Sequence, residues 1–203
     1  MKNLTIKSKL REIKDIFLKR SFLELLIERS NLKYTVNDLV KLSYVSVVKK
    51  GKLYFNNQNY SAKNPYTIGS AYMQGQEFIF GGFDRYNKEG FSTQISNVWT
   101  VYNLKYSKEM KIAGLRFVFK KVKKEFLYGK KSKMINGFIV YFMDKERLFL
   151  EYVRDYLAYP VSYFDQIYRE LDQPLLRKYA KKYPIKKVIL KLNEIKNVSL
   201  EHK

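Results

Sequence analysis

The spacing of apolar residues predicts helices at the start of the chain. Apolar side chains recur at helical spacing over residues 4–20, which predicts one long first helix. Ser21 and Glu24 have the spacing of a capping box, so a second helix is expected to begin with Ser21 as its N-cap. Thr35 and Asp38 form a similar pair and predict a further short helix.

A β-hairpin is predicted directly after these helices. Residues 44–55 are rich in β-branched and aromatic side chains, and Lys49-Lys50-Gly51-Lys52 interrupts them as a turn. Polar and turn-forming residues 56–64 follow and end at Pro65. We therefore expect a boundary there, between a domain of residues 1–62 and a domain of residues 63–203.

The rest of the chain reads as strands followed by helices. After a short helix at residues 65–73, four segments have apolar patterns that suit strands, namely 77–83, 98–104, 114–122 and 136–143. Asp144 and Ser162 are placed to cap two helices, and helical spacing continues over residues 175–183 and 185–197. This order predicts an α+β fold, with a mixed sheet and a helical C-terminal third.

Composition and charge point to a folded protein with a polyanionic partner. Of the 203 residues, 46% are hydrophobic and 16% aromatic, which is too much apolar mass for a disordered basic tail. Lys and Arg number 40 against 19 Asp and Glu, so the formal net charge is +21. A charge of this size favours nucleic acid, an anionic membrane surface or an acidic protein as partner.

Several kinds of chemistry are excluded by residue counts. The chain has no Cys, and its one His, His202, is next to last. These counts exclude thiol nucleophiles and Cys-based metal sites, and they argue against a His-dependent triad. There is no Gly-rich phosphate loop, so we expect no cofactor and no metal. No apolar run reaches membrane-spanning length and no signal core is present, so the expected location is the cytoplasm and no membrane partner is expected.

No set of residues carries a catalytic signature. Asp144 and Glu146 are better explained by capping and by the helix dipole than by acid–base chemistry. Asp84, Lys88 and Glu89 are the nearest approach to a nuclease set, and their surroundings indicate a solvated loop. We therefore predict a protein without enzymatic activity.

Two groups of lysines are the candidate binding residues. The first is the hairpin tip with nearby lysines, which resembles the wing of a DNA-binding domain and could contact phosphates: Lys33, Lys41, Lys49, Lys50 and Lys52. The second is a longer basic stretch that could hold DNA or a protein partner: Lys120, Lys121, Lys123, Lys124, Lys130, Lys131 and Lys133. Solubilising turns and protected sheet edges are the alternative explanations for both groups.

Four segments between Pro65 and Asp172 follow one another in an order and at spacings that fit a known family, namely residues 65–72, 98–103, 111–129 and 143–150. On these segments the chain resembles the AbiEi antitoxin family of type IV toxin–antitoxin systems. In the last of these, Lys145 stands where the family usually has Pro.

The resemblance implies a two-part protein. An N-terminal winged helix would bind the operator of its own operon, and the C-terminal domain would counter a nucleotidyltransferase-like toxin. Only Ser43 and Tyr44 separate the expected short helix from the hairpin, so we expect a degenerate winged helix that lacks a base-reading helix. Two other hypotheses stay open: a nuclease-like enzyme with unmarked carboxylates, and a protein-interaction module that has lost DNA binding.

Overall fold

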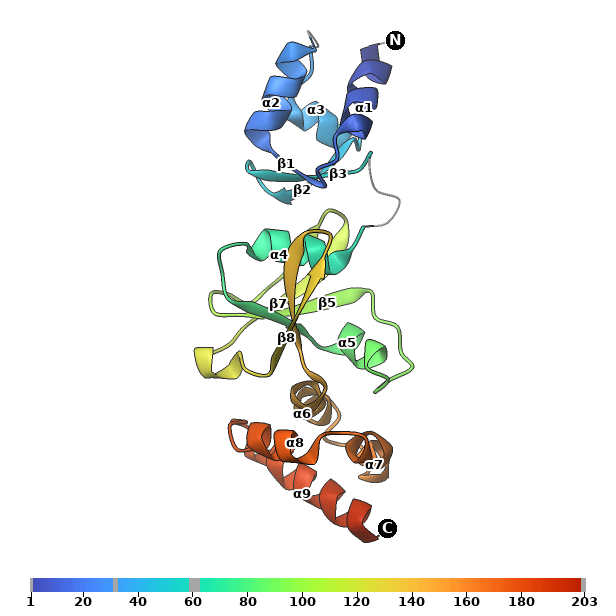
Figure 1. Cartoon of the computed structure of the whole chain (residues 1–203), viewed down its shortest axis with the longest axis vertical. Coiled ribbons are helices and arrows are strands. Elements are labelled where there is room, and N and C mark those ends of the chain that lie inside the picture. Colours follow the sequence, from blue (N-terminus) through green and yellow to red (C-terminus); the bar gives the residue numbers. More distant parts are fainter. Residues whose placement is uncertain (1, 31–32, 59–62, 202–203) are drawn as a thin grey trace. The chain divides into compact units, whose positions relative to one another are not determined.

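The computed structural model has the predicted α+β fold and describes residues 2–30, 33–58 and 63–201 (Figure 1). Its contacts divide the chain into two units. Unit 1 comprises Met1–Gly75, Met110–Phe117 and Ile135–Phe138, and unit 2 comprises the remaining residues. The boundary predicted between residues 62 and 63 falls at residues 59–62, which lie outside the described residues, as does His202.

Unit 1 begins with three helices and a three-stranded antiparallel sheet. The helices are α1 (Lys2–Glu12), α2 (Arg20–Arg29) and α3 (Val36–Lys41). The strands are β1 (Phe17–Lys19), β2 (Val45–Lys49) and β3 (Leu53–Asn56), arranged in the order β1-β3-β2. The elements therefore follow one another along the chain as α1-β1-α2-α3-β2-β3.

The prediction of one helix over residues 4–20 is wrong after Glu12. Phe17, Leu18 and Lys19 instead form β1, where Phe17 pairs with Phe55 of β3. The apolar spacing of these residues also suits a helix, but pairing with β3 buries Leu18 in a sheet. Tertiary pairing of this kind overrides a local sequence pattern. Ser21 is also not an N-cap, since α2 already begins at Arg20 behind the extended Lys19.

The predicted capping box and hairpin are confirmed. The Thr35 side chain accepts a hydrogen bond from the Asp38 amide at 3.2 Å, and the Asp38 carboxylate accepts one from the Thr35 amide at 2.8 Å. Asp38 accepts the Thr35 hydroxyl as well, and these bonds lower the pKa of its carboxyl. β2 and β3 pair as an antiparallel hairpin with a register shift between Val47 and Lys49.

A buried cluster holds α1, α2 and α3 on the three-stranded sheet. It includes Leu10 of α1, Leu23 of α2, Leu39 of α3 and Val45 of β2, and each is almost fully excluded from solvent. Helix α4 (Pro65–Met73) also belongs to unit 1 and confirms the predicted short helix. Asn64 caps it by accepting hydrogen bonds from two backbone amides of its first turn.

The larger sheet is mixed, as predicted, and has six strands. They are β4 (Phe78–Gly81), β5 (Val98–Asn103), β6 (Lys108–Ile112), β7 (Leu115–Lys121), β8 (Lys130–Ile135) and β9 (Phe138–Met143). Their order is β6-β7-β5-β4-β9-β8, and β4 pairs antiparallel with β5 and parallel with β9. A short helix α5 (Phe83–Lys88) and a 3-10 turn η1 (Lys124–Phe126) complete this part of the chain.

Two strands of this sheet, β6 and β8, were not predicted. Both lie at sheet edges, and β8 is exposed over nearly its whole length. An exposed edge strand needs no buried face, so its sequence lacks the alternation on which the other strands were predicted.

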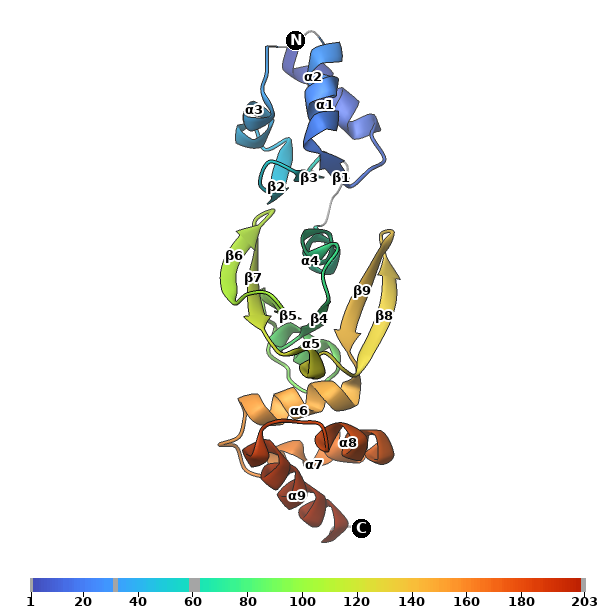
Figure 2. The ribbon, with the colours of Figure 1, turned by 90° about the vertical axis from the view of Figure 1, so that its left-hand side faces the viewer.

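The helical C-terminal third is confirmed. It consists of α6 (Lys145–Asp155), α7 (Ser162–Arg169), α8 (Gln173–Ala180) and α9 (Lys186–Glu201). Both views show α6 between the sheet and the other three helices (Figure 1; Figure 2). Asp144 caps α6 as predicted, by accepting the Arg147 amide at 2.9 Å. Ser162 does not cap α7, because it is the first helical residue and Val161 precedes it in helical conformation.

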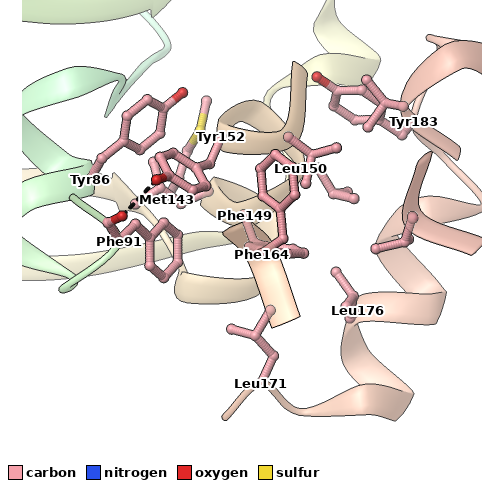
Figure 3. Close-up of a cluster of buried hydrophobic side chains, with 14 of the residues drawn as sticks. Tyr86, Phe91, Met143, Phe149, Leu150, Tyr152, Phe164, Leu171, Leu176 and Tyr183 are labelled. Atoms are coloured by element: carbon pink, nitrogen blue, oxygen red, sulfur yellow. Dashed lines mark hydrogen bonds between the residues drawn. The ribbon is translucent and has the colours of Figure 1, made fainter. Parts of the chain in front are cut away.

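The core of unit 2 is aromatic. Tyr86, Phe91, Phe149, Tyr152 and Phe164 meet between α5, α6 and α7, and the Tyr152 hydroxyl donates to the Phe91 carbonyl at 2.7 Å (Figure 3). The rings contact mostly edge to face, an arrangement that adds stability beyond the burial of area.

Candidate nucleic-acid interface

The tip of the β2–β3 hairpin presents lysines on a tight turn. The Lys52 amide donates to the Lys49 carbonyl at 2.9 Å and closes the turn. Gly51 takes a φ of +70° inside it, a conformation that glycine adopts without strain. Lys50 and Lys52 are exposed and Lys49 is half-buried. The turn therefore displays three cations within four residues.

Helix α3 and its flanks display the other two lysines of this group. Lys41 is exposed at the last position of α3, and Lys33 is exposed before the helix begins. Asn37 is exposed as well, one helical turn before Lys41 and on the same face. The backbone passes from α3 into β2 within three residues, so the exposed face of α3 and the hairpin belong to consecutive elements.

Lys63 of unit 1 differs from these exposed lysines, because it stabilises the fold. Its ammonium group donates to the Ala113 carbonyl at 2.8 Å and lies 5.7 Å from the centre of the Phe55 ring. Burial lowers the pKa of this ammonium group. Lys63 therefore holds unit 1 together and is not part of the exposed group.

The second predicted basic group does not form one patch. Lys120 and Lys121 end β7, and Lys123 and Lys124 lie at the following η1 turn. The other three, Lys130, Lys131 and Lys133, lie on β8, and β5, β4 and β9 separate β7 from β8 in the sheet. The two halves of the group are therefore two separate surfaces.

Part of each half already has a partner within unit 2. The Lys120 ammonium group lies 5.7 Å from the centre of the Tyr102 ring, and Lys130 lies 3.8 Å from a Glu77 carboxylate oxygen. Lys131 and Lys133 line a pocket of about 280 Å³ together with the ion pair of Arg85 and Glu89. The lysines on β8 lie on an exposed edge strand, where charged side chains discourage pairing with another strand.

The acidic residues weighed as catalytic candidates have structural roles. Asp144 caps α6 and also accepts the Tyr179 hydroxyl at 2.6 Å, and Glu146 is buried and accepts the Asp172 amide at 3.2 Å. Asp84 is buried in the first turn of α5, so the prediction of a solvated loop around Asp84, Lys88 and Glu89 is wrong. Within residues 2–30, 33–58 and 63–201, no three Asp, Glu or His side chains are grouped to hold a metal ion. The absence of enzymatic activity stays a prediction.

A buried ionic network underlies the C-terminal helices. The Glu151 carboxylate is fully buried, and it contacts Arg147 at 2.5 Å and forms an ion pair with Arg154. Tyr183 donates its hydroxyl to the same carboxylate at 3.0 Å. The Arg147 guanidinium is fully buried too, 4.3 Å from the centre of the Phe126 ring. This network joins α6 to the segment between α8 and α9.

Three cations that sequence reasoning passed over lie together in unit 2. Arg177, Lys181 and Lys196 line one groove between α7, α8 and α9. The spacing of Arg177 and Lys181, four residues apart, was a signal that both face the same way. Their proximity to Lys196 depends on how the helices pack, and nothing in the local pattern indicates it.

Comparisons with known proteins identify a shared fold. No protein-family model matches the chain, and no curated protein matches it significantly. The crystal structure of the RV2827C protein from Mycobacterium tuberculosis is similar, with a TM-score of 0.61 and 10% sequence identity. The match covers 92% of this chain and 75% of that chain. At this identity the likeness shows the fold alone. Among the described residues, no helix is long and apolar enough to cross a membrane.

Proposed function

We propose that this chain is an AbiEi-like antitoxin and transcriptional autoregulator without enzymatic activity. It binds DNA, the operator of its own operon, through the basic surface of unit 1, and it counters a nucleotidyltransferase-like toxin. One observation carries the DNA-binding part: α3, which exposes Asn37 and Lys41 on one face, is followed within three residues by a hairpin whose tip displays Lys49, Lys50 and Lys52.

The order of elements in unit 1 supports a winged-helix domain. A winged helix has the order helix, strand, helix, helix, strand, strand, and the part of unit 1 before α4 has the order α1-β1-α2-α3-β2-β3. The sequence predicted a shortened domain because only Ser43 and Tyr44 separate the short helix from the hairpin, which left no room for a further helix there. With β1 at Phe17–Lys19 between the first two helices, the order of elements fits a winged helix in which α3 itself would serve as the recognition helix.

The exposed side chains of unit 1 suit two kinds of DNA contact. The lysines of the hairpin tip would neutralise phosphates, which gives affinity without base information. Asn37 and Lys41 on the exposed face of α3 are of the types that bind adenine and guanine edges in the major groove. Affinity would then depend on the hairpin and base preference on α3.

Fluorescence anisotropy with the full chain tests this division of roles. The probes are a labelled duplex from upstream of the gene and a shuffled duplex of the same composition, each at several salt concentrations. Asn37→Ala should reduce the preference for the upstream duplex, since each good base contact contributes about 1–3 kcal/mol of discrimination. If Asn37→Ala leaves the preference for the upstream duplex unchanged, α3 does not recognise bases through Asn37. If neither duplex binds at low salt, the result favours a protein-interaction module that has lost DNA binding. If the protein cleaves the duplex in the presence of a metal ion, the result favours a nuclease-like enzyme.

Co-expression tests the antitoxin part separately. The chain is expressed together with a nucleotidyltransferase-like toxin encoded beside its gene, and growth is measured. The parent protein and the Lys49→Glu/Lys50→Glu/Lys52→Glu variant should both relieve growth arrest, because neutralisation is assigned to the C-terminal part. Continued arrest with the parent protein would refute the antitoxin assignment.

A further inference from the structure

The helices at the end of unit 2 form a groove with an apolar floor. Tyr168 of α7, Leu176 of α8 and Leu192 of α9 are nearly fully buried beneath it. Ala180 and Ile189 are partly buried and complete the floor. The groove therefore offers apolar surface that the packing of the three helices leaves accessible.

The rim of this groove is positively charged. Arg177, Lys181 and Lys196 are exposed around it, and among the residues that the structure describes no acidic side chain lines it. Among the described residues, the Arg177 guanidinium donates a hydrogen bond from Nε to the Gln173 carbonyl at 3.2 Å. The last 31 residues carry nine basic and two acidic side chains, so the rim belongs to a strongly cationic part of the chain.

Three acidic residues on or beside these helices pair with basic residues outside the rim. Asp165 pairs with Arg169 at 2.7 Å, and Glu194 pairs with Lys191 at 3.4 Å. Glu170 likewise pairs with Lys145 of α6 at 3.1 Å. The positive charge around the groove is therefore available to a partner.

The size of the groove selects the kind of occupant. Its volume is about 250 Å³, which lies below the roughly 300–1,000 Å³ typical of small-molecule pockets. A dry cavity of about 150 Å³ holds one benzene ring, so this groove has room for one or two apolar side chains. Phosphates of a nucleic acid would be attracted to the rim but would leave the apolar floor unmatched.

We propose that this groove, defined by Leu176, Ala180, Ile189 and Leu192 with its rim of Arg177, Lys181 and Lys196, docks an acidic amphipathic helix of a partner protein. The apolar side chains of that helix enter the groove, and its carboxylates pair with the rim. This goes beyond the proposed DNA binding, since it uses only residues of unit 2. It provides a protein-binding surface independent of the hairpin.

Anisotropy with a designed peptide tests the proposal on the full chain. The probe is a fluorescein-labelled peptide of about four helical turns, with leucines at helical spacing and glutamates between them. A scrambled peptide of the same composition and a single-stranded oligonucleotide serve as competitors. We expect the designed peptide to bind and the scrambled peptide to compete about tenfold less well, because the scrambled form cannot place its leucines on one face.

Two variants separate the groove from general positive charge. Arg177→Glu/Lys181→Glu/Lys196→Glu should weaken peptide binding by about tenfold or more, whereas the matched Lys178→Glu/Lys182→Glu/Lys187→Glu should change it little. Ala180→Trp should abolish binding by filling the groove without a change of charge, and Gln166→Trp on α7 is its control. Circular dichroism checks that each variant is folded.

Three results would overturn the proposal: equal binding of designed and scrambled peptides, equal losses in the rim and control variants, or displacement of the peptide by the oligonucleotide. None of them depends on DNA binding by unit 1, which the hairpin variants measure separately.

Discussion

Glu151→Gln should destabilise unit 2 severely. The substitution keeps the shape of the side chain and removes one negative charge from the fully buried network beneath the C-terminal helices. In the parent protein this carboxylate is the counter-ion of Arg147 at 2.5 Å and of Arg154, and it accepts the hydroxyls of Tyr183 at 3.0 Å and Tyr102 at 3.2 Å.

The expected loss of stability depends on which counter-ions Arg154 and Arg147 keep in the Glu151→Gln variant. Arg154 keeps Asp155 as a partner at 2.7 Å and is partly exposed, so its charge stays compensated. Arg147 is fully buried, and among the described residues its Nε and Nη2 have no hydrogen-bond partner. Its cation–π contacts with Phe126, Tyr128 and Tyr183 would remain, but they do not supply a counter-ion. Breaking a buried pair in this way costs about 3–5 kcal/mol.

Urea unfolding followed by tryptophan fluorescence measures this loss. Trp99 is the only tryptophan and lies on β5 in unit 2, so its emission reports on that unit. Glu170→Gln is the matched control, because it breaks the exposed pair with Lys145 and should cost less than about 1 kcal/mol. Arg147→Met/Glu151→Gln should recover part of the loss by removing the orphaned charge. If Glu151→Gln loses no more stability than Glu170→Gln, the network does not stabilise unit 2.

Three further predictions concern single residues. Thr35→Ala removes the cap of α3 and should lower the free energy of unfolding by about 1 kcal/mol in urea titrations, while Thr35→Ser should retain most of it. Gly129→Ala should lower the free energy of unfolding more than Gly137→Ala. Both glycines have positive φ, where an alanine is strained by about 1–3 kcal/mol. Only at Gly129 would the new Cβ also lie 2.7 Å from the Arg147 side chain. Equal losses of stability in the two variants would show that the contact with Arg147 adds nothing to the effect at Gly129. Burial raises the pKa of Tyr128 to about 12, against a weaker opposing effect of Arg147. The folded state therefore favours the neutral phenol. Its contribution to stability is complete below pH 10, the ordinary pKa of tyrosine, and is lost as the pH rises through 12. Tyrosinate absorbance of the parent minus Tyr128→Phe should show this titration, and a midpoint near 10 would contradict it.

Much of the fold was predictable where local chemistry determines it. The Thr35–Asp38 capping box, the turn at Gly51 and the Asp144 cap each depend on residues close together in sequence, and all three are confirmed. The central strands β5, β7 and β9 were predicted because burial imposes apolar alternation on them.

Features that depend on distant pairing were not predictable in this way. Phe17–Lys19 is a strand because β3 pairs with it, although its apolar spacing also suits a helix. The same limit applies to the candidate sites. The lysines of residues 120–133 look continuous in sequence, but the sheet order separates β7 from β8. The groove in unit 2 arises only when α7, α8 and α9 pack, which brings Tyr168 near Leu192.

The salt dependence of DNA binding by the hairpin variant is the most direct test of the proposed function. Each phosphate contact contributes a slope of about −0.9 in the plot of log affinity against log salt concentration. Lys49→Glu/Lys50→Glu/Lys52→Glu should therefore weaken binding to all duplexes about equally and make the slope shallower by up to about 2.7, the sum for three contacts. The matched Lys178→Glu/Lys182→Glu/Lys187→Glu, with the same change of charge in unit 2, should keep the parent slope. A hairpin variant with the parent's affinity and slope, or an equal loss in the control, would contradict DNA binding through this surface.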